Sequence, residues 1–144
     1  NLVITKEDLM AELENISNDF LEGLIVRTLP NSENKKTRNY LKEKSSFFTI
    51  EAMEYLVNLG IKHLLVDLPS VDRLLDEGML SSHNIFWETK EKKFNPNAKN
   101  KTITELIFVP DTVKNGCYLL NLQIPSFISD AAPSRPILYI IDEL

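Results

Sequence analysis

The chain has 144 residues, 43% of them hydrophobic and 26% charged, and a formal net charge of −5. A chain of this length buries roughly two-thirds of its unfolded surface, so we expect residues 1–144 to form a single domain. The acidic balance argues against nucleic acid as the main partner, and no apolar run approaches the roughly 20 residues of a transmembrane helix. With one cysteine and no signal-peptide pattern, the chain is expected to be cytoplasmic and away from membranes.

The first half of the chain reads as strand, helix and strand. The apolar run at 24–29 predicts a buried strand, and the charged segment at 31–46 predicts a solvated loop. Residues 50–59 have apolar positions at helical spacing, and residues 63–67 form the next apolar run. This order predicts two parallel strands joined by a right-handed helical crossover, which is typical of an α/β fold.

The second half is richer in strands. We expect Ser81 or Ser82 to cap a short helix that carries His83, and the charged stretch at 88–101 to be irregular. Alternating or apolar runs then predict three further strands, at residues 102–109, 118–124 and 137–141.

Glu105 is the sharpest anomaly in the predicted strands. Strand alternation would place it in the apolar face formed by Ile103, Ile107 and Val109. An ionised carboxylate there is costly unless it is paired, hydrogen-bonded or bound to a metal ion. Metal binding or catalysis is one interpretation. The others are an edge strand with Glu105 in water, or an ion pair with an arginine, for which the candidates are Arg27, Arg73 and Arg135.

Four other side chains are candidates for chemistry or for shaping a site. His83 can bind a metal ion or move a proton, although a lone histidine is more often simply exposed or packed. Asp67 and Asp72 flank Ser70. Asp67 ends a strand, where open α/β sheets place functional side chains, but capping the turn is an equally good role for it. We interpret His63, in an apolar strand, as structural.

The order of several segments resembles the cyclase family of metal-dependent hydrolases, which includes bacterial kynurenine formamidase (arylformamidase). The resemblance covers most of the chain beyond residue 22. The segments that carry it are LIVRTLP, FTIEAMEYLVNLGIKHLLVDLPSVD, GMLSSHNIFWE, ITELIFVP and YLLNLQIPSFISDAAPSRPILY. It implies a swivelling β/α/β-type fold with a mixed sheet and flanking helices, here lacking its N-terminal part.

The resemblance also implies a divalent metal ion, Zn²⁺ or Mn²⁺, whose bound water attacks the carbonyl of a small amide of formamidase or cyclic-amide type. The family's HxGTHxDxPxH signature, which supplies most ligands, is absent from these residues. By position, His83 and Glu105 match the histidine and glutamate that the C-terminal half contributes to the metal, with His83 also a catalytic candidate. Asp67, Ser70 and Asp72 would shape the site.

The chain alone is therefore expected to be inactive and to need a missing N-terminal segment or a second copy in a homo-oligomer. The alternative is a non-enzymatic, truncated or degenerate domain that serves as a binding or assembly module. If His83 and Glu105 bind one metal ion, their donor atoms should lie roughly 3–4 Å apart, and without the ion they should relax to about 6–8 Å.

Overall fold

The computed structural model describes residues 3–89, 93, 95–126 and 128–141. The chain divides into two compact units, residues 1–110 and residues 111–144. Helices combine with parallel and antiparallel strand pairs, which confirms the predicted α/β class. Within the described ranges, no helix is long and apolar enough to cross a membrane. The expectation of one domain stays a prediction.

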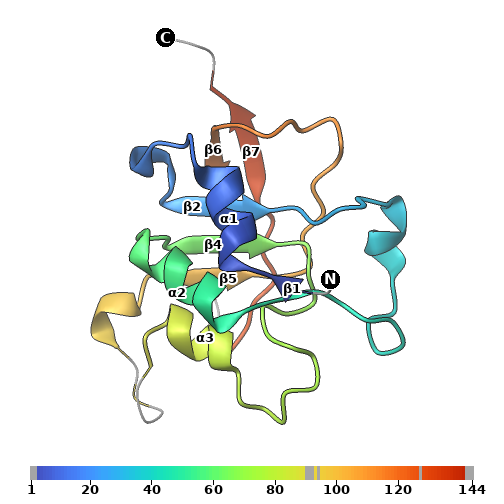
Figure 1. Ribbon diagram of the computed structural model, residues 1–144, viewed down its shortest axis with the longest axis vertical. Helices are drawn as coiled ribbons and strands as arrows, with labels where there is room; N and C mark the ends of the chain where they lie inside the picture. The colour runs from blue at the N-terminus through green and yellow to red at the C-terminus, as the bar shows by residue number, and fades with distance from the viewer. Residues whose placement is uncertain (1–2, 90–92, 94, 127, 142–144) are drawn as a thin grey trace. The chain divides into compact units, whose positions relative to one another are not determined.

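The first unit is built on a three-stranded parallel sheet with the order β2-β4-β5 (Figure 1). Its strands are β2 (Gly23–Val26), β4 (His63–Val66) and β5 (Thr102–Thr104). The central strand β4 is almost wholly apolar, and Leu64, Leu65 and Val66 are fully buried, as expected for a strand covered on both faces. The predicted strand at 63–67 and its parallel pairing with β2 are thus confirmed.

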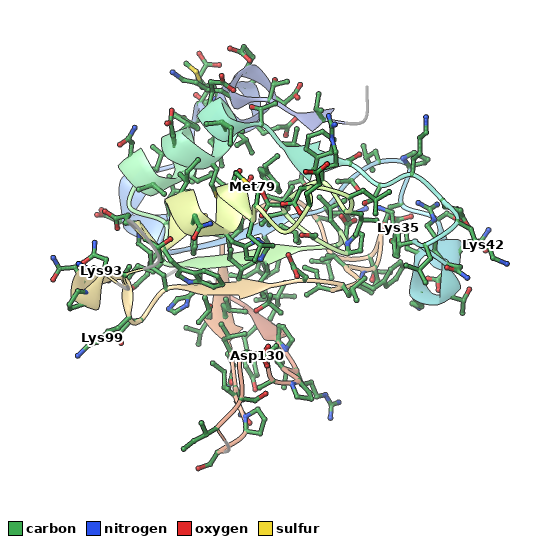
Figure 2. All side chains as sticks on the ribbon, turned by 90° about the horizontal axis from the view of Figure 1, so that it is seen from below. Lys35, Lys42, Met79, Lys93, Lys99 and Asp130 are labelled. Atoms are coloured by element: carbon green, nitrogen blue, oxygen red, sulfur yellow. The ribbon has the colours of Figure 1, made fainter. Side chains whose placement is uncertain are left out.

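Three helices lie on one face of this sheet: α1 (Lys6–Leu13), α2 (Ile50–Asn58) and α3 (Ser81–Phe86) (Figures 1 and 2). The predicted helix at 50–59 is confirmed as α2, whose buried face packs with β4 in the core. Gly60 ends it with a φ of 81°, a left-handed conformation that costs glycine little. Short parallel strands and 3₁₀ turns complete the unit: β1 (Val3–Ile4), β3 (Phe47–Phe48), η1 (Asn18–Phe20), η2 (Glu33–Thr37) and η3 (Pro96–Ala98).

The segment at 31–46 is only partly the solvated loop that its charge predicts. Most of its residues are exposed, but it contains η2, and the side chain of Lys35 is only 6% exposed. Its ammonium lies 2.7 Å from a carboxylate oxygen of Asp67 at the end of β4. A buried ion pair thus fastens this segment to the sheet.

The predicted strand at 102–109 was wrong beyond Thr104, where β5 ends. Leu106 has a φ of 57°, in the left-handed region, so the regular alternation stops at Glu105. The chain stays hydrogen-bonded to the end of β4, since the backbone N–H groups of Leu106 and Ile107 donate to Leu68 and Val66. Glu105 therefore follows the strand and is not in the middle of an apolar face.

The second unit contains one antiparallel pair, β6 (Tyr118–Asn121) and β7 (Ile137–Ile140). In its register Leu119 faces Tyr139, and Leu120 faces Leu138. The predicted strands at 118–124 and 137–141 therefore exist but are shorter than expected.

Candidate functional site

Three ionisable side chains meet beside the end of β5 and the start of α3. Nδ1 of His83 lies 2.6 Å from Oδ2 of Asp72, and Nε2 of the same ring lies 3.4 Å from Oε1 of Glu105. The side chains of Asp72 and His83 are 6% and 15% exposed, and that of Glu105 is 29% exposed. The imidazole thus lies between two carboxylates in a largely buried position.

The first turn of α3 is held by Asp72 and not by its own serines. Oδ1 of Asp72 accepts the backbone N–H of Ser82 at 2.6 Å, and Oδ2 accepts that of His83 at 3.3 Å. The N-cap position is Leu80, in the left-handed conformation and without a side-chain cap. The prediction that Ser81 or Ser82 caps this helix was therefore wrong, because a more distant carboxylate fills the role.

The far end of α3 is fixed against the segment that leads into β5. The indole N–H of Trp87 donates to the carbonyl of Lys101 at 3.1 Å, and the Lys101 ammonium donates to the carbonyl of Phe86. The Trp87 ring also lies 5.3 Å from the His83 ring, centroid to centroid. These contacts anchor α3 beside β5 and so place His83 near Glu105.

Glu105 is oriented by the turn that follows β4. Its Oε1 accepts the backbone N–H of Val71 at 2.9 Å. Two of the arginines considered as partners make other contacts: Arg27 donates to the carbonyl of Pro110, and Arg73 lies over the ring of Phe47. Glu105 contacts His83, so the imidazole provides the charge partner that the sequence left open.

The two carboxylates strongly favour the protonated form of His83. Burial of the ring favours the neutral imidazole, but hydrogen bonds and charge from Asp72 and Glu105 outweigh it and raise the pKa to about 9. For Asp72, burial by itself raises the pKa of the carboxyl group. Its hydrogen bonds with His83 and Ser82 outweigh burial, so the pKa is lowered overall. Without a metal ion, the group is an ion-paired imidazolium between two carboxylates.

Asp67 is occupied by the buried ion pair described above. Besides Lys35, its carboxylate accepts the backbone N–H and the hydroxyl of Thr28, each at 2.9 Å. Ser70 accepts the backbone N–H of Asp72 at 3.1 Å, which stabilises the turn. His63 pairs with Thr102 through Nδ1 and the hydroxyl at 2.9 Å, in keeping with the structural role expected for it.

Among the described residues, no group of three or more histidine, cysteine, aspartate or glutamate side chains is arranged to hold a metal ion. Nε2 of His83 and Oε1 of Glu105 nevertheless have the separation of two ligands of one ion. An ion pair gives the same distance. The donor types, imidazole and carboxylate, are those that Zn²⁺ and Mn²⁺ accept.

Sequence reasoning missed the contact between Asp72 and His83. It treated Asp72 as a turn residue, since an isolated aspartate after a serine is common in turns. The only signal was the presence of a histidine eleven residues further on. Because Asp72 lies in the loop before α3, this spacing carries no information about their contact. The backbone N–H of Val71 orients Glu105, and no residue type in the sequence signals a contact made by the backbone.

Comparison with known proteins identifies the family of the chain. The sequence profile of the Cyclase family, described as putative cyclase, matches residues 1–73, about half of the chain. The chain belongs to the Cyclase family. The match includes Asp67, Ser70 and Asp72 and ends before His83 and Glu105.

Two solved structures resemble this Cyclase-family chain in fold. One is a predicted metal-dependent hydrolase from Bacillus stearothermophilus, with 22% identity and a TM-score of 0.61, and 96% of this chain covers 57% of that one. The other is a potential metal-dependent hydrolase with cyclase activity, with 24% identity and a TM-score of 0.62, and 96% of this chain covers 58% of it. The chain thus spans less than two-thirds of the length of these structures. No curated protein matches it.

Proposed function

We propose that this Cyclase-family chain supplies two ligands, His83 and Glu105, to the metal centre of a hydrolase that acts on a small amide of formamidase or cyclic-amide type. The observation that carries the proposal is the 3.4 Å separation of Nε2 of His83 and Oε1 of Glu105. The two residues belong to separate elements, α3 and the end of β5, so chain connectivity does not force them together.

The surroundings of the two donors support a metal ion. A histidine ligand usually donates its other ring N–H to a carboxylate, and Asp72 occupies that position at 2.6 Å from Nδ1. Glu105 keeps 29% of its side chain exposed, which leaves access from solvent or from another chain. In this proposal the remaining ligands come from residues outside these 144 or from a second copy of the chain.

His83 through Nε2 and Glu105 through its carboxylate would hold a divalent ion, Zn²⁺ or Mn²⁺, and Asp72 would orient His83 through Nδ1. When bound, such an ion would supply a water of lowered pKa and a Lewis acid for a substrate carbonyl. We do not favour a non-enzymatic module. A metal centre explains why Nε2 of His83 and Oε1 of Glu105 lie together, and it agrees with the metal-dependent hydrolases that this chain resembles in fold.

The test is an assay of the native full-length protein, loaded with Zn²⁺ or Mn²⁺, on an aryl formamide such as N-formylkynurenine and on cyclic amides. We expect hydrolysis to be lost in His83→Asn and Glu105→Gln together with bound metal. Glu54→Gln, which changes an exposed glutamate of α2, is the matched control and should keep both. Full activity and metal content in either site variant would refute the proposal.

A further inference from the structure

The carboxylate of Asp72 faces three nitrogen atoms at once. Its Oδ1 accepts the backbone N–H of Ser82, and its Oδ2 accepts the backbone N–H of His83 while lying 2.6 Å from Nδ1 of the His83 ring. Both oxygens therefore already act as acceptors toward groups that can only donate. The side chain is 6% exposed, so solvent does little to compensate for a mismatched contact.

This arrangement determines where a neutral His83 ring carries its proton. Oδ2 of Asp72 can only accept, so the facing Nδ1 of His83 must carry the proton and donate it. If Nδ1 carried a lone pair instead, two acceptors would face each other in a buried place without a hydrogen bond. The lone pair of the neutral ring then belongs to Nε2, which points toward Glu105. Turning the ring over would remove Nδ1 from Asp72 and lose this bond.

We propose that Asp72 is a positioning residue that keeps the proton of neutral His83 on Nδ1 and thereby presents the lone pair of Nε2 beside Glu105. This inference rests on the proposed function, in which Nε2 is the metal-binding atom. It assigns Asp72 an action through His83 and no contact with metal or substrate.

The same turn also orients the second donor. Val71, directly before Asp72, donates its backbone N–H to Glu105, and its carbonyl accepts the backbone N–H of Phe48 in β3 at 2.9 Å. Ser70 accepts the backbone N–H of Asp72. One turn of three residues, anchored to a neighbouring strand, therefore sets the direction of both His83 and Glu105.

The test is the tautomer of His83 in the metal-free protein, read from long-range ¹H–¹⁵N correlations of the ring at a pH well above 9, where His83 is neutral. We expect the wild-type ring to carry its proton on Nδ1. His63, the other histidine, provides an internal reference in the same spectrum. A wild-type ring protonated on Nε2 would overturn the inference, and this measurement requires no variant to fold.

Asp72→Asn extends the test. An amide cannot accept on both sides, so its NH₂ group either faces Nδ1 and moves the proton to Nε2, or faces Ser82 and leaves that N–H unpaired. We expect the Nε2–H form to appear, and the affinity for Zn²⁺ to fall by about 10–100-fold. An unchanged tautomer in a folded Asp72→Asn protein whose Ser82 backbone N–H stays hydrogen-bonded, as read from its amide hydrogen exchange, also contradicts the inference.

Asp76→Asn is the matched control, because Asp76 lies in the same loop and accepts the backbone N–H groups of Gly78 and Leu80. It should change neither the tautomer nor the affinity. Addition of Zn²⁺ to the wild-type native full-length protein, in which the proposed metal site is complete, separates the two proposals. If Zn²⁺ leaves the Nε2 signal of His83 unmoved while the proton lies on Nδ1, the metal function fails and the positioning role of Asp72 stands.

Discussion

The backbone N–H of Val71 donates to Oε1 of Glu105 across 2.9 Å, and that same oxygen lies 3.4 Å from Nε2 of His83. A backbone donor stabilises the charged carboxylate and sets its direction. The orientation of Glu105 therefore does not depend on His83 or on a bound ion. This separates its contribution to the fold from its contribution to a metal centre.

Glu105→Gln should consequently lose metal while keeping the fold. The amide oxygen still accepts from Val71, so we expect the free energy of unfolding to fall by no more than about 2 kcal/mol. Loss of the negative charge should weaken binding of a divalent ion by at least about 10-fold. Metal analysis beside a thermal melt checks both. A large loss of stability with unchanged metal content would show that Glu105 is only the ion-pair partner of His83.

The isolated 144-residue chain should bind Zn²⁺ only weakly. Two protein ligands leave a four-coordinate ion mostly hydrated. Calorimetric titration at neutral pH should give a dissociation constant weaker than about 1 µM. Tighter binding with one ion per chain would mean that these residues alone complete the site.

Much of what positions the site could be predicted because its signals are local. The apolar positions of α2 repeat at helical spacing, and Thr49 and Gly60 mark its two ends. The central strand β4 follows an apolar run, so a strand at 63–67 was expected from residue type alone. A parallel crossover was then the expected connection between β2 and β4.

The contacts within the site were harder to predict, because they depend on how distant segments fold back. The left-handed Leu106 ends β5 early, and leucine gives no signal for that conformation as glycine would. Glu105 was recognised as an anomaly from a strand that in fact stops before it. Asp72 reaches His83 only because the intervening loop returns to the sheet, and no periodicity encodes that return.

The metal-free protein should lose stability as the pH rises from 6.5 to about 9, the two pKa values of His83 in the unfolded and folded states. Its pKa of about 9 in the folded state lies above the ordinary value of 6.5, so the folded protein binds this proton more tightly. The resulting stabilisation is complete below 6.5, declines between 6.5 and 9, and is absent above that range. Its full size is at most about 3 kcal/mol.

Denaturant titrations in the presence of a chelator measure this effect. The free energy of unfolding should decrease across the range in the wild type and stay nearly constant in His83→Gln, which lacks the titrating ring. The two proteins differ only at residue 83, so a difference between their curves reports on His83. Parallel curves for the two proteins would show that the carboxylates do not hold the His83 proton.

Lys35→Met should be among the most destabilising single changes in the loop at 31–46. The Lys35 ammonium bonds to Asp67 at 2.7 Å and to the hydroxyl of Thr28 at 3.0 Å, and the Asp67 side chain is fully buried. Removing the ammonium leaves a buried carboxylate without a cation, which typically costs about 3–5 kcal/mol. Equilibrium unfolding in urea measures the loss.

Two further variants identify its cause. Lys42→Met, at an exposed lysine of the same segment at the periphery in Figure 2, should change stability by less than about 0.5 kcal/mol. Adding Asp67→Asn to Lys35→Met removes the unpaired charge but keeps an oxygen that can accept from Thr28, so part of the stability should return. If Lys35→Met behaves like Lys42→Met, the ion pair does not fasten this loop to β4, and the segment is the solvated excursion that its charge suggests.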